Sequence, residues 1–227
     1  MSIADRVAAV RERIARAAEE CGRRPEGIEL IAVSKKQPAE SVREAYEAGL
    51  RAFGENYAQE LVAKAPALAD LTDLRWHFIG HLQSNKAKVV AQHADAVHSV
   101  DSVGLAGELG KRVAAGARSK AMPVLIEVNV SGEAQKSGAN PGAVGGIVDA
   151  VRGQPSLHLR GLMTVPPAAD GPAARRAFEA LYELREKHGG SAELPELSMG
   201  MSADLELAIA CGTTMVRVGT AIFGERR

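Results

Sequence analysis

The 227-residue sequence predicts a single (β/α)8 TIM barrel with an extra N-terminal helix. Short apolar or β-branched runs alternate along the chain with longer helical patterns, which indicates a parallel sheet covered by helices. Eight such units fit one closed barrel, and this length is normal for one such domain. No low-complexity linker divides residues 1–227, so we expect one domain. A doubly wound open sheet is the alternative.

The predicted elements follow in order along the chain. Apolar residues from Ile3 to Ala18 recur at spacings of three and four, which predicts an amphipathic helix that ends near Gly22. The predicted strands are 28–34, 51–54, 75–79, 95–100, 122–130, 157–163, 195–199 and 214–218. The helices predicted between them are 39–49, 56–68, 84–92, 102–116, 140–152, 172–188 and 203–211. The Pro-, Gly- and Ala-rich stretch 164–174 is predicted to be a loop over one face.

The composition argues against several classes of function. The 28 lysines and arginines balance the 28 aspartates and glutamates, so the formal net charge is zero. The sequence therefore lacks the basic character that is typical of nucleic-acid-binding domains. Cys21 and Cys211 form no CxxC motif, which favours a reducing compartment. The N-terminus lacks the apolar run of a signal peptide, and no stretch approaches the ~20 apolar residues that span a bilayer. We therefore expect a cytoplasmic protein without a membrane anchor, and a monomer because no helix shows an obvious apolar outer face.

The ligand site of such a barrel lies at the carboxyl ends of the strands, in the loops that lead into the helices. The residues that directly follow the predicted strands are mostly small and polar. They are 34–36, 54–57, 80–85, 101, 129–131, 163–164, 198–202 and 219–220. We expect these segments to face one mouth of the barrel.

Two of these loops have the features of a phosphate site. "SMGMSADLELAIA" places Ser202 where it would cap the helix 203–211, and helix N-termini attract anions. "VRVGTAIFG" ends the last strand with Gly219, which lets the backbone approach a ligand, and with the hydroxyl of Thr220. The loops after strands seven and eight often bind phosphate in these barrels. We favour this interpretation over simple caps and turns.

Lys35 and Lys36 follow the first predicted strand. Most lysines are solvated, but a pocket at a strand tip would favour the neutral amine that attacks a carbonyl to form a Schiff base. With a phosphate site, such a lysine fits a sugar phosphate, as in an aldolase, or pyridoxal 5′-phosphate. The sequence pattern alone does not decide which of the two ligands binds, nor which of the two lysines would react.

Arg217 lies within the last predicted strand and needs a partner, because an unpaired buried charge is costly. A carboxylate or the ligand could each supply it. His77 and His81 straddle a strand end, unlike the helical HExxH pair, so we expect His77 to be a hydrogen-bonded core residue. Carboxylates do not gather at the strand ends, and no metal site is predicted.

Six motifs carry a resemblance to a known family. They are "AVSK" (32–35), "FGENY" (53–57), "WHFIGHLQSNK" (76–86), "RGLMTV" (160–165), "LSMGMSADLELAI" (197–209) and "MVRVGTAIFG" (215–224). In this order they resemble the pyridoxal phosphate homeostasis proteins, also called the proline-synthetase co-transcribed family. The resemblance covers residues 28–224 and implies a barrel like the alanine racemase N-terminal domain.

The resemblance also assigns the site. It implies that pyridoxal 5′-phosphate forms a Schiff base with Lys35, whereas Lys36 falls at a variable position. The remaining cofactor-binding residues that it implies are Asn56, Ser198, Met201, Ser202, Arg217, Gly219 and Thr220. Of these, Ser198, Ser202, Gly219 and Thr220 would surround the phosphate, and Arg217 would lie near the ring.

The resemblance implies a cofactor-binding protein in vitamin B6 homeostasis, with no established catalytic reaction and with apo-enzymes as potential recipients of the cofactor. The alternative is a pyridoxal phosphate-dependent amino-acid racemase or decarboxylase. In racemases of this fold the second acid/base comes from an added β domain, and we expect no such domain here because the sequence ends in "FGERR". Tyr57, the tyrosine nearest the predicted mouth, is expected to be a pocket wall. We therefore favour binding over catalysis.

Overall fold

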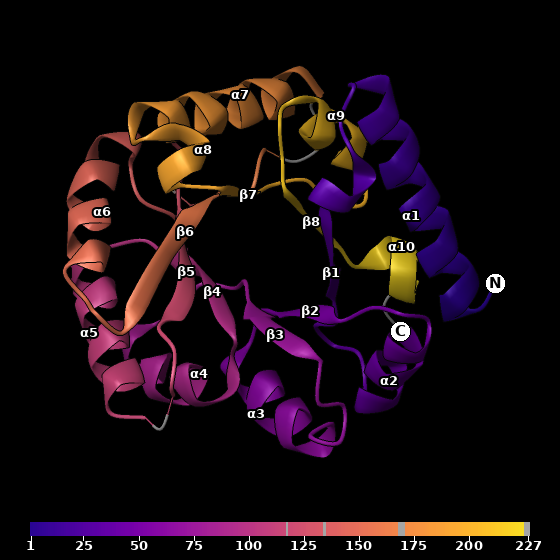
Figure 1. Ribbon diagram of the computed structural model, residues 1–227, viewed down its shortest axis with the longest axis horizontal. Helices are drawn as coiled ribbons and strands as arrows, with labels where there is room; N and C mark the ends of the chain where they lie inside the picture. The colour runs from indigo at the N-terminus through magenta and orange to yellow at the C-terminus, as the bar shows by residue number, and fades with distance from the viewer. Residues whose placement is uncertain (117, 134, 168–170, 225–227) are drawn as a thin grey trace.

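The computed structural model describes residues 1–116, 118–133, 135–167 and 171–224. Eight parallel strands form a closed barrel in the order β1 to β8, and β8 pairs with β1. Helices surround the ring (Figure 1). The strands are β1 (Glu29–Val33), β2 (Ala52–Glu55), β3 (Arg75–Phe78), β4 (Ala96–Val100), β5 (Met122–Glu127), β6 (Leu157–Met163), β7 (Glu196–Ser198) and β8 (Met215–Val218). The predicted barrel is therefore confirmed, and the open sheet is wrong.

The helices alternate with the strands as the sequence predicts. They are α1 (Ile3–Glu20), α2 (Ala39–Glu47), α3 (Ala58–Ala67), α4 (Ala87–His93), α5 (Val103–Ala114), α6 (Val144–Arg152), α7 (Gly171–Lys187), α8 (Gly190–Glu193), α9 (Leu205–Ala210) and α10 (Thr220–Phe223). Short 3-10 helices occur at Pro25–Gly27 (η1), Ser84–Lys86 (η2) and Pro141–Ala143 (η3).

The extra N-terminal helix α1 is set by its cap and by one apolar face. The hydroxyl of Ser2 accepts the backbone N–H of Asp5, whose carboxylate accepts the backbone N–H of Ser2. This capping box satisfies two N–H groups that the helix itself leaves unpaired. The buried face of α1, from Ile3 to Ala18, packs against α2, α9 and α10 (Figure 1).

The differences from prediction lie at element ends. The predicted strand 122–130 stops at Glu127, and residues 129–131 belong to the following loop. The predicted helix 84–92 begins as the 3-10 helix η2. Within the predicted loop 164–174, residues 171–174 belong to α7, and 168–170 lie outside the described residues. The helices α8 and α10 were not predicted, since four residues are too few to show a periodic pattern.

The barrel interior changes character along its axis. Ile31, Ala52 and Met215 form a small apolar cluster separate from the main core between strands and helices. Nearer the carboxyl ends of the strands, the buried residues are polar, among them His77 and Arg217. This polar layer forms the base on which the functional site is built.

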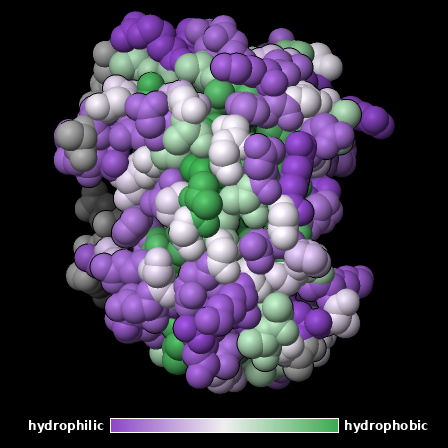
Figure 2. Space-filling view, turned by 90° about the vertical axis from the view of Figure 1, so that its left-hand side faces the viewer, coloured by the Kyte–Doolittle hydropathy of each residue, from purple (hydrophilic) through white to green (hydrophobic). Residues whose placement is uncertain are grey.

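The outer face that carries α5 and α6 is largely hydrophilic, with a group of apolar residues near its centre and a few others scattered around it (Figure 2). Within the described part of the chain, no helix is long and apolar enough to cross a membrane.

Candidate functional site

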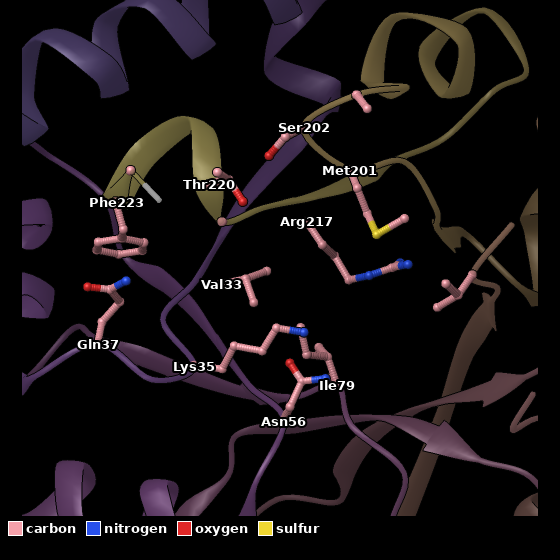
Figure 3. Close-up of a pocket in the computed structure, with 14 residues that line it drawn as sticks. Val33, Lys35, Gln37, Asn56, Ile79, Met201, Ser202, Arg217, Thr220 and Phe223 are labelled. Atoms are coloured by element: carbon pink, nitrogen blue, oxygen red, sulfur yellow. The ribbon is translucent and has the colours of Figure 1, made fainter. Parts of the chain in front are cut away.

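A pocket of about 360 Å³ opens at the carboxyl ends of the strands, where β1, β2 and β8 meet the loop after β7. Seven of the eight residues predicted for the site line it (Figure 3). They are Lys35, Asn56, Met201, Ser202, Arg217, Gly219 and Thr220. Apolar side chains, among them Val33, Ile79 and Phe223, complete the wall. Concave pockets with an apolar wall and a few converging polar groups are typical small-molecule sites.

The structure separates the two lysines. Strand β1 ends at Val33, and both lysines lie in the turn that follows. Lys35 is half-buried and lines the pocket, whereas Lys36 is exposed and adopts a left-handed backbone conformation with φ of 61°. The directions of the two lysine side chains are therefore set by the turn, and not by the alternation of side chains along a strand. Of the two lysines, Lys35 is therefore the one that a ligand in this pocket would meet.

Ser202 and Thr220 bring the loops after β7 and β8 to one end of the pocket. The backbone N–H of Ala221 lies 3.4 Å from Ser202 Oγ, which links the two loops. In Figure 3 the two hydroxyls point toward the same space, at the end away from Lys35 and Asn56. Hydroxyl groups in such a pair can donate hydrogen bonds to an anion.

The predicted capping role of Ser202 is wrong. Helix α9 starts at Leu205, and its N-cap residue is Asp204, whose side chain accepts the backbone N–H of Met201 at 2.6 Å. Residues 202–204 form turns before the helix begins, so Ser202 is left to face the pocket.

Gly219 lies where the main chains of β1 and β8 approach one another at the pocket rim. A Cβ atom at this position would lie 3.3 Å from the carbonyl oxygen of Val33, which is tighter than most such contacts. The absence of a side chain therefore keeps the strand end close to Val33 and leaves its backbone accessible on the pocket side.

Arg217 is 4% exposed and held by two hydrogen bonds. Its Nη1 donates to Ser198 Oγ at 2.7 Å, and its Nη2 donates to the carbonyl oxygen of Thr164 at 2.9 Å. Burial lowers the pKa of Arg217 to about 10, against the opposing charge of Glu127, so the guanidinium stays protonated at neutral pH. Its hydrogen-bond partners are thus a hydroxyl and a carbonyl oxygen, and among the described residues no carboxylate forms an ion pair with it; of the two alternatives left open by the sequence, a carboxylate partner is not found.

Ser198 does not face the pocket. It is fully buried behind Arg217, and its hydroxyl lies between Arg217 Nη1 and His98 Nδ1, the latter at 3.0 Å. Of the eight residues predicted for the site, Ser198 is thus the one that does not line the pocket, and it belongs to the layer that supports Arg217. His98 in turn contacts His77, so the prediction of a hydrogen-bonded core histidine is confirmed.

Asn56 carries an unused hydrogen-bonding atom beside Lys35. Among the described residues, its Oδ1 is buried and has no hydrogen-bond partner. The backbone of Asn56 is fixed by Gly80, where an added Cβ would come within 2.1 Å of the Asn56 carbonyl oxygen. A buried polar atom without a partner is costly, so this oxygen is available to a ligand.

Sequence reasoning missed a buried network under the Lys35 turn. Lys64 Nζ lies 2.8 Å from Glu55 Oε1 and from Glu60 Oε2, and 2.8 Å from the carbonyl oxygen of Ser34. Glu55 is fully buried and also accepts the Ser34 hydroxyl at 2.7 Å. The i, i+4 spacing of Glu60 and Lys64 could have signalled an ion pair, but not its burial against β1 and β2.

The remaining candidates lie outside this pocket. Tyr57 is 46% exposed and lines a smaller adjoining pocket, which shares Asn56. Within the described residues, no group of three or more His, Cys, Asp or Glu side chains is placed to hold a metal ion.

The fold and the pocket together define a class of protein. It is a (β/α)8 barrel that presents one lysine amine, one buried arginine and two hydroxyl-bearing loops to a small-molecule pocket at the carboxyl ends of its strands. The alanine racemase N-terminal domain family matches residues 6–227.

Known relatives define the family more closely. The pyridoxal phosphate homeostasis protein of Pseudomonas aeruginosa is 49% identical, covering 99% of this chain and 96% of the relative. PipY of Synechococcus elongatus was solved without pyridoxal phosphate (37% identity, TM-score 0.85) and with it bound (36%, TM-score 0.82). Both comparisons cover 98% of this chain and 100% of PipY. The chain belongs to the pyridoxal phosphate homeostasis protein family.

Proposed function

We propose that this protein binds pyridoxal 5′-phosphate in the pocket at Lys35 and contributes to intracellular vitamin B6 homeostasis. When bound, this cofactor supplies an aldehyde that can condense with an amine, and a phosphate that needs hydrogen-bond donors. One observation carries the proposal: Lys35 shares a single pocket with the hydroxyls of Ser202 and Thr220, which lie at its other end.

The other groups in the pocket fit the same ligand. Asn56 Oδ1, which has no partner within the described residues, can accept a hydrogen bond near Lys35. The protonated guanidinium of Arg217 lies between the two ends in Figure 3 and can face the cofactor ring. In our assignment Ser202, Gly219 and Thr220 contact the phosphate, while Ser198 acts only through Arg217.

We propose that the role is to hold and supply the cofactor, and not to turn over amino acids. The curated relative is named for homeostasis, and the structure of PipY exists both with and without the cofactor. Tyr57, the tyrosine nearest the predicted mouth, lines the smaller adjoining pocket and not the one at Lys35. Apo-enzymes that need pyridoxal phosphate are the partners that such a role implies.

We further propose that residues 1–227 act as one domain, as a monomer in the cytoplasm. Both cysteines are free thiols, Cys21 exposed and Cys211 buried, as a reducing compartment would leave them. Size-exclusion chromatography with light scattering tests the oligomeric state.

The absorption spectrum of the purified protein with added pyridoxal 5′-phosphate tests the cofactor site. We compare wild type, Lys35→Ala and Lys36→Ala, each before and after borohydride. The exposed neighbour Lys36 is the matched control, since it lies in the same turn but does not line the pocket.

We expect a yellow band that borohydride removes in wild type and in Lys36→Ala, and no such band in Lys35→Ala. A wild-type protein that stays colourless with excess pyridoxal 5′-phosphate would contradict the proposal. It would favour the aldolase-like alternative, which is then tested by borohydride trapping with a sugar phosphate.

A further inference from the structure

The turn that carries Lys35 adopts a conformation that its sequence does not favour. Gln37 N donates to the carbonyl oxygen of Ser34 at 3.0 Å, which closes the turn directly after β1. Lys36 is, within the described residues, the one non-glycine residue with a positive φ. A left-handed conformation costs a side-chain-bearing residue roughly 1–2 kcal/mol. Contacts from elsewhere must therefore hold the turn in this shape.

Two side chains of α3 supply those contacts, one on each side of Lys35. Lys64 Nζ donates to the carbonyl oxygen of Ser34 at 2.8 Å, in the peptide group before Lys35. Glu60 Oε2 accepts the backbone N–H of Lys36 at 2.7 Å, in the peptide group after it. The same Oε2 atom lies 2.8 Å from Lys64 Nζ, so the two contacts form one unit.

This unit is anchored in the fold. Lys64 is 7% exposed, and its amine also lies 2.8 Å from Oε1 of the fully buried Glu55 at the end of β2. That Glu55 oxygen accepts the hydroxyl of Ser34 as well. Charge-assisted hydrogen bonds of this kind are about twice as strong as neutral ones, and buried networks of them are rigid. The turn is thus fixed to α3 and β2 by contacts that do not involve the pocket.

We propose that Glu60 and Lys64 are positioning residues for Lys35: they hold the main chain on both sides of it, so that its amine faces the pocket before a ligand arrives. The inference rests on the proposed function, because it assigns them a part in the reaction of Lys35 with an aldehyde. In that reaction the amine adds to the carbonyl carbon and water leaves. A displacement of about 1 Å of a reacting group can slow a reaction by about a hundredfold, so a fixed position of the Lys35 main chain should speed the reaction.

A purely structural role makes a different prediction. If the network only joined α3 to β1, breaking it would weaken stability and every mode of binding together. A positioning role affects the covalent step and leaves non-covalent binding largely intact. Pyridoxine 5′-phosphate separates the two, because it carries a hydroxymethyl group where pyridoxal 5′-phosphate carries its aldehyde.

Glu60→Ala is the principal variant. It removes the acceptor for the Lys36 N–H but leaves the buried Lys64–Glu55 pair in place. Lys64→Met is unsuitable as the principal variant, since it would leave Glu55 as a buried charge without its partner and endanger folding. Glu60→Gln restores an acceptor without the charge, and Glu12→Ala on the exposed face of α1 is the matched control.

The experiment has three readouts. Stopped-flow absorbance gives the rate of the covalent reaction with pyridoxal 5′-phosphate, titration gives the affinity for pyridoxine 5′-phosphate, and hydrogen exchange reports the Lys36 amide in the protein without ligand. For Glu60→Ala we expect a rate at least about tenfold lower, with less than about a twofold change in pyridoxine 5′-phosphate affinity and faster exchange at Lys36. Glu60→Gln should recover part of the rate, and Glu12→Ala should match wild type.

Each other outcome is decisive. A Glu60→Ala rate within twofold of wild type overturns the positioning role and leaves the proposed function intact. An equal loss of rate and of pyridoxine 5′-phosphate affinity also overturns it, in favour of a structural role. If wild type binds pyridoxine 5′-phosphate but forms no adduct with pyridoxal 5′-phosphate, the proposed function itself fails and the positioning role with it.

Discussion

Nδ1 of His77 lies 2.9 Å from Nε2 of His98 inside the barrel, with the two rings edge to face at a centroid distance of 5.1 Å. The contact continues through Ser198 Oγ to Arg217 in the pocket. One proton on each ring satisfies these bonds, so both histidines can remain neutral. Burial lowers the pKa of His77 and holds that of His98 well below 6.5, where the nearby His77 and Arg217 act in the same direction.

We predict that acid destabilises the protein through this pair. Below about pH 6.5 the unfolded chain binds protons at these rings that the folded protein does not bind. The stability that neutral histidines confer is complete above that pH and is lost as the pH falls toward their folded pKa. His98→Gln, which does not titrate, should remove about 1 kcal/mol of the loss between pH 6.5 and 5.5. Urea unfolding at several pH values measures it.

The exposed His158 provides the control for this measurement. His158→Gln makes the same substitution at the surface, outside the histidine pair. If His98→Gln and wild type lose the same stability on acidification, the histidine pair is not the source of the effect.

The fold was predictable because its signal is repeated eight times. Each strand is a short apolar run and each major helix a periodic pattern, and a parallel barrel is the compact arrangement of eight such units. The ends of elements depend on single contacts instead. The N-cap residue of α9 is Asp204 and not Ser202, and the Asp204 side chain accepts the N–H of Met201. From the local sequence alone, either residue could have capped the helix.

The residues that line the candidate pocket were predictable where they follow a strand, and less so where a strand-end side chain is buried behind another residue. Lys35, Asn56 and Thr220 lie at strand ends, so the topology brings them together. Ser198 also ends a strand, but its side chain points into the barrel and contacts His98, from a strand about a hundred residues earlier in the chain. Such pairings depend on the register of distant strands, which a single sequence does not contain.

The hydroxyls of Ser202 and Thr220 should determine affinity for the phosphate group specifically. Ser202→Ala and Thr220→Ala each remove one donor at the pocket end away from Lys35. We expect each variant to bind pyridoxal 5′-phosphate about tenfold more weakly, the usual cost of losing a hydrogen bond to a charged group. Binding of pyridoxal, which has no phosphate, should be unchanged. Titration of both ligands measures the ratio, and an equal loss for both would show that these hydroxyls do not contact the phosphate.

Glu127 affects the pH dependence of the unfolding free energy in the opposite direction to the His77–His98 pair. The residue is 7% exposed, and within the described residues its Oε2 is buried and has no hydrogen-bond partner. Burial, together with the charge of Asp101, raises the pKa of Glu127 to about 7 against the opposing effect of Arg217. A raised carboxyl pKa means that the folded protein binds a proton that the unfolded chain has released. This stability is present below the unfolded value of 4.5 and is lost as the pH rises through 7.

Glu127→Gln should therefore gain stability relative to wild type as the pH increases. From pH 4.5 to pH 8 we expect the unfolding free energy of the variant to rise by about 1–3 kcal/mol relative to that of wild type. The histidines titrate in both proteins, so their effect cancels in this difference. Denaturant unfolding at the two pH values measures it, with the exposed Glu183→Gln as control. A difference that stays constant would mean that Glu127 is ionised throughout, held in that state by Arg217 in spite of its burial.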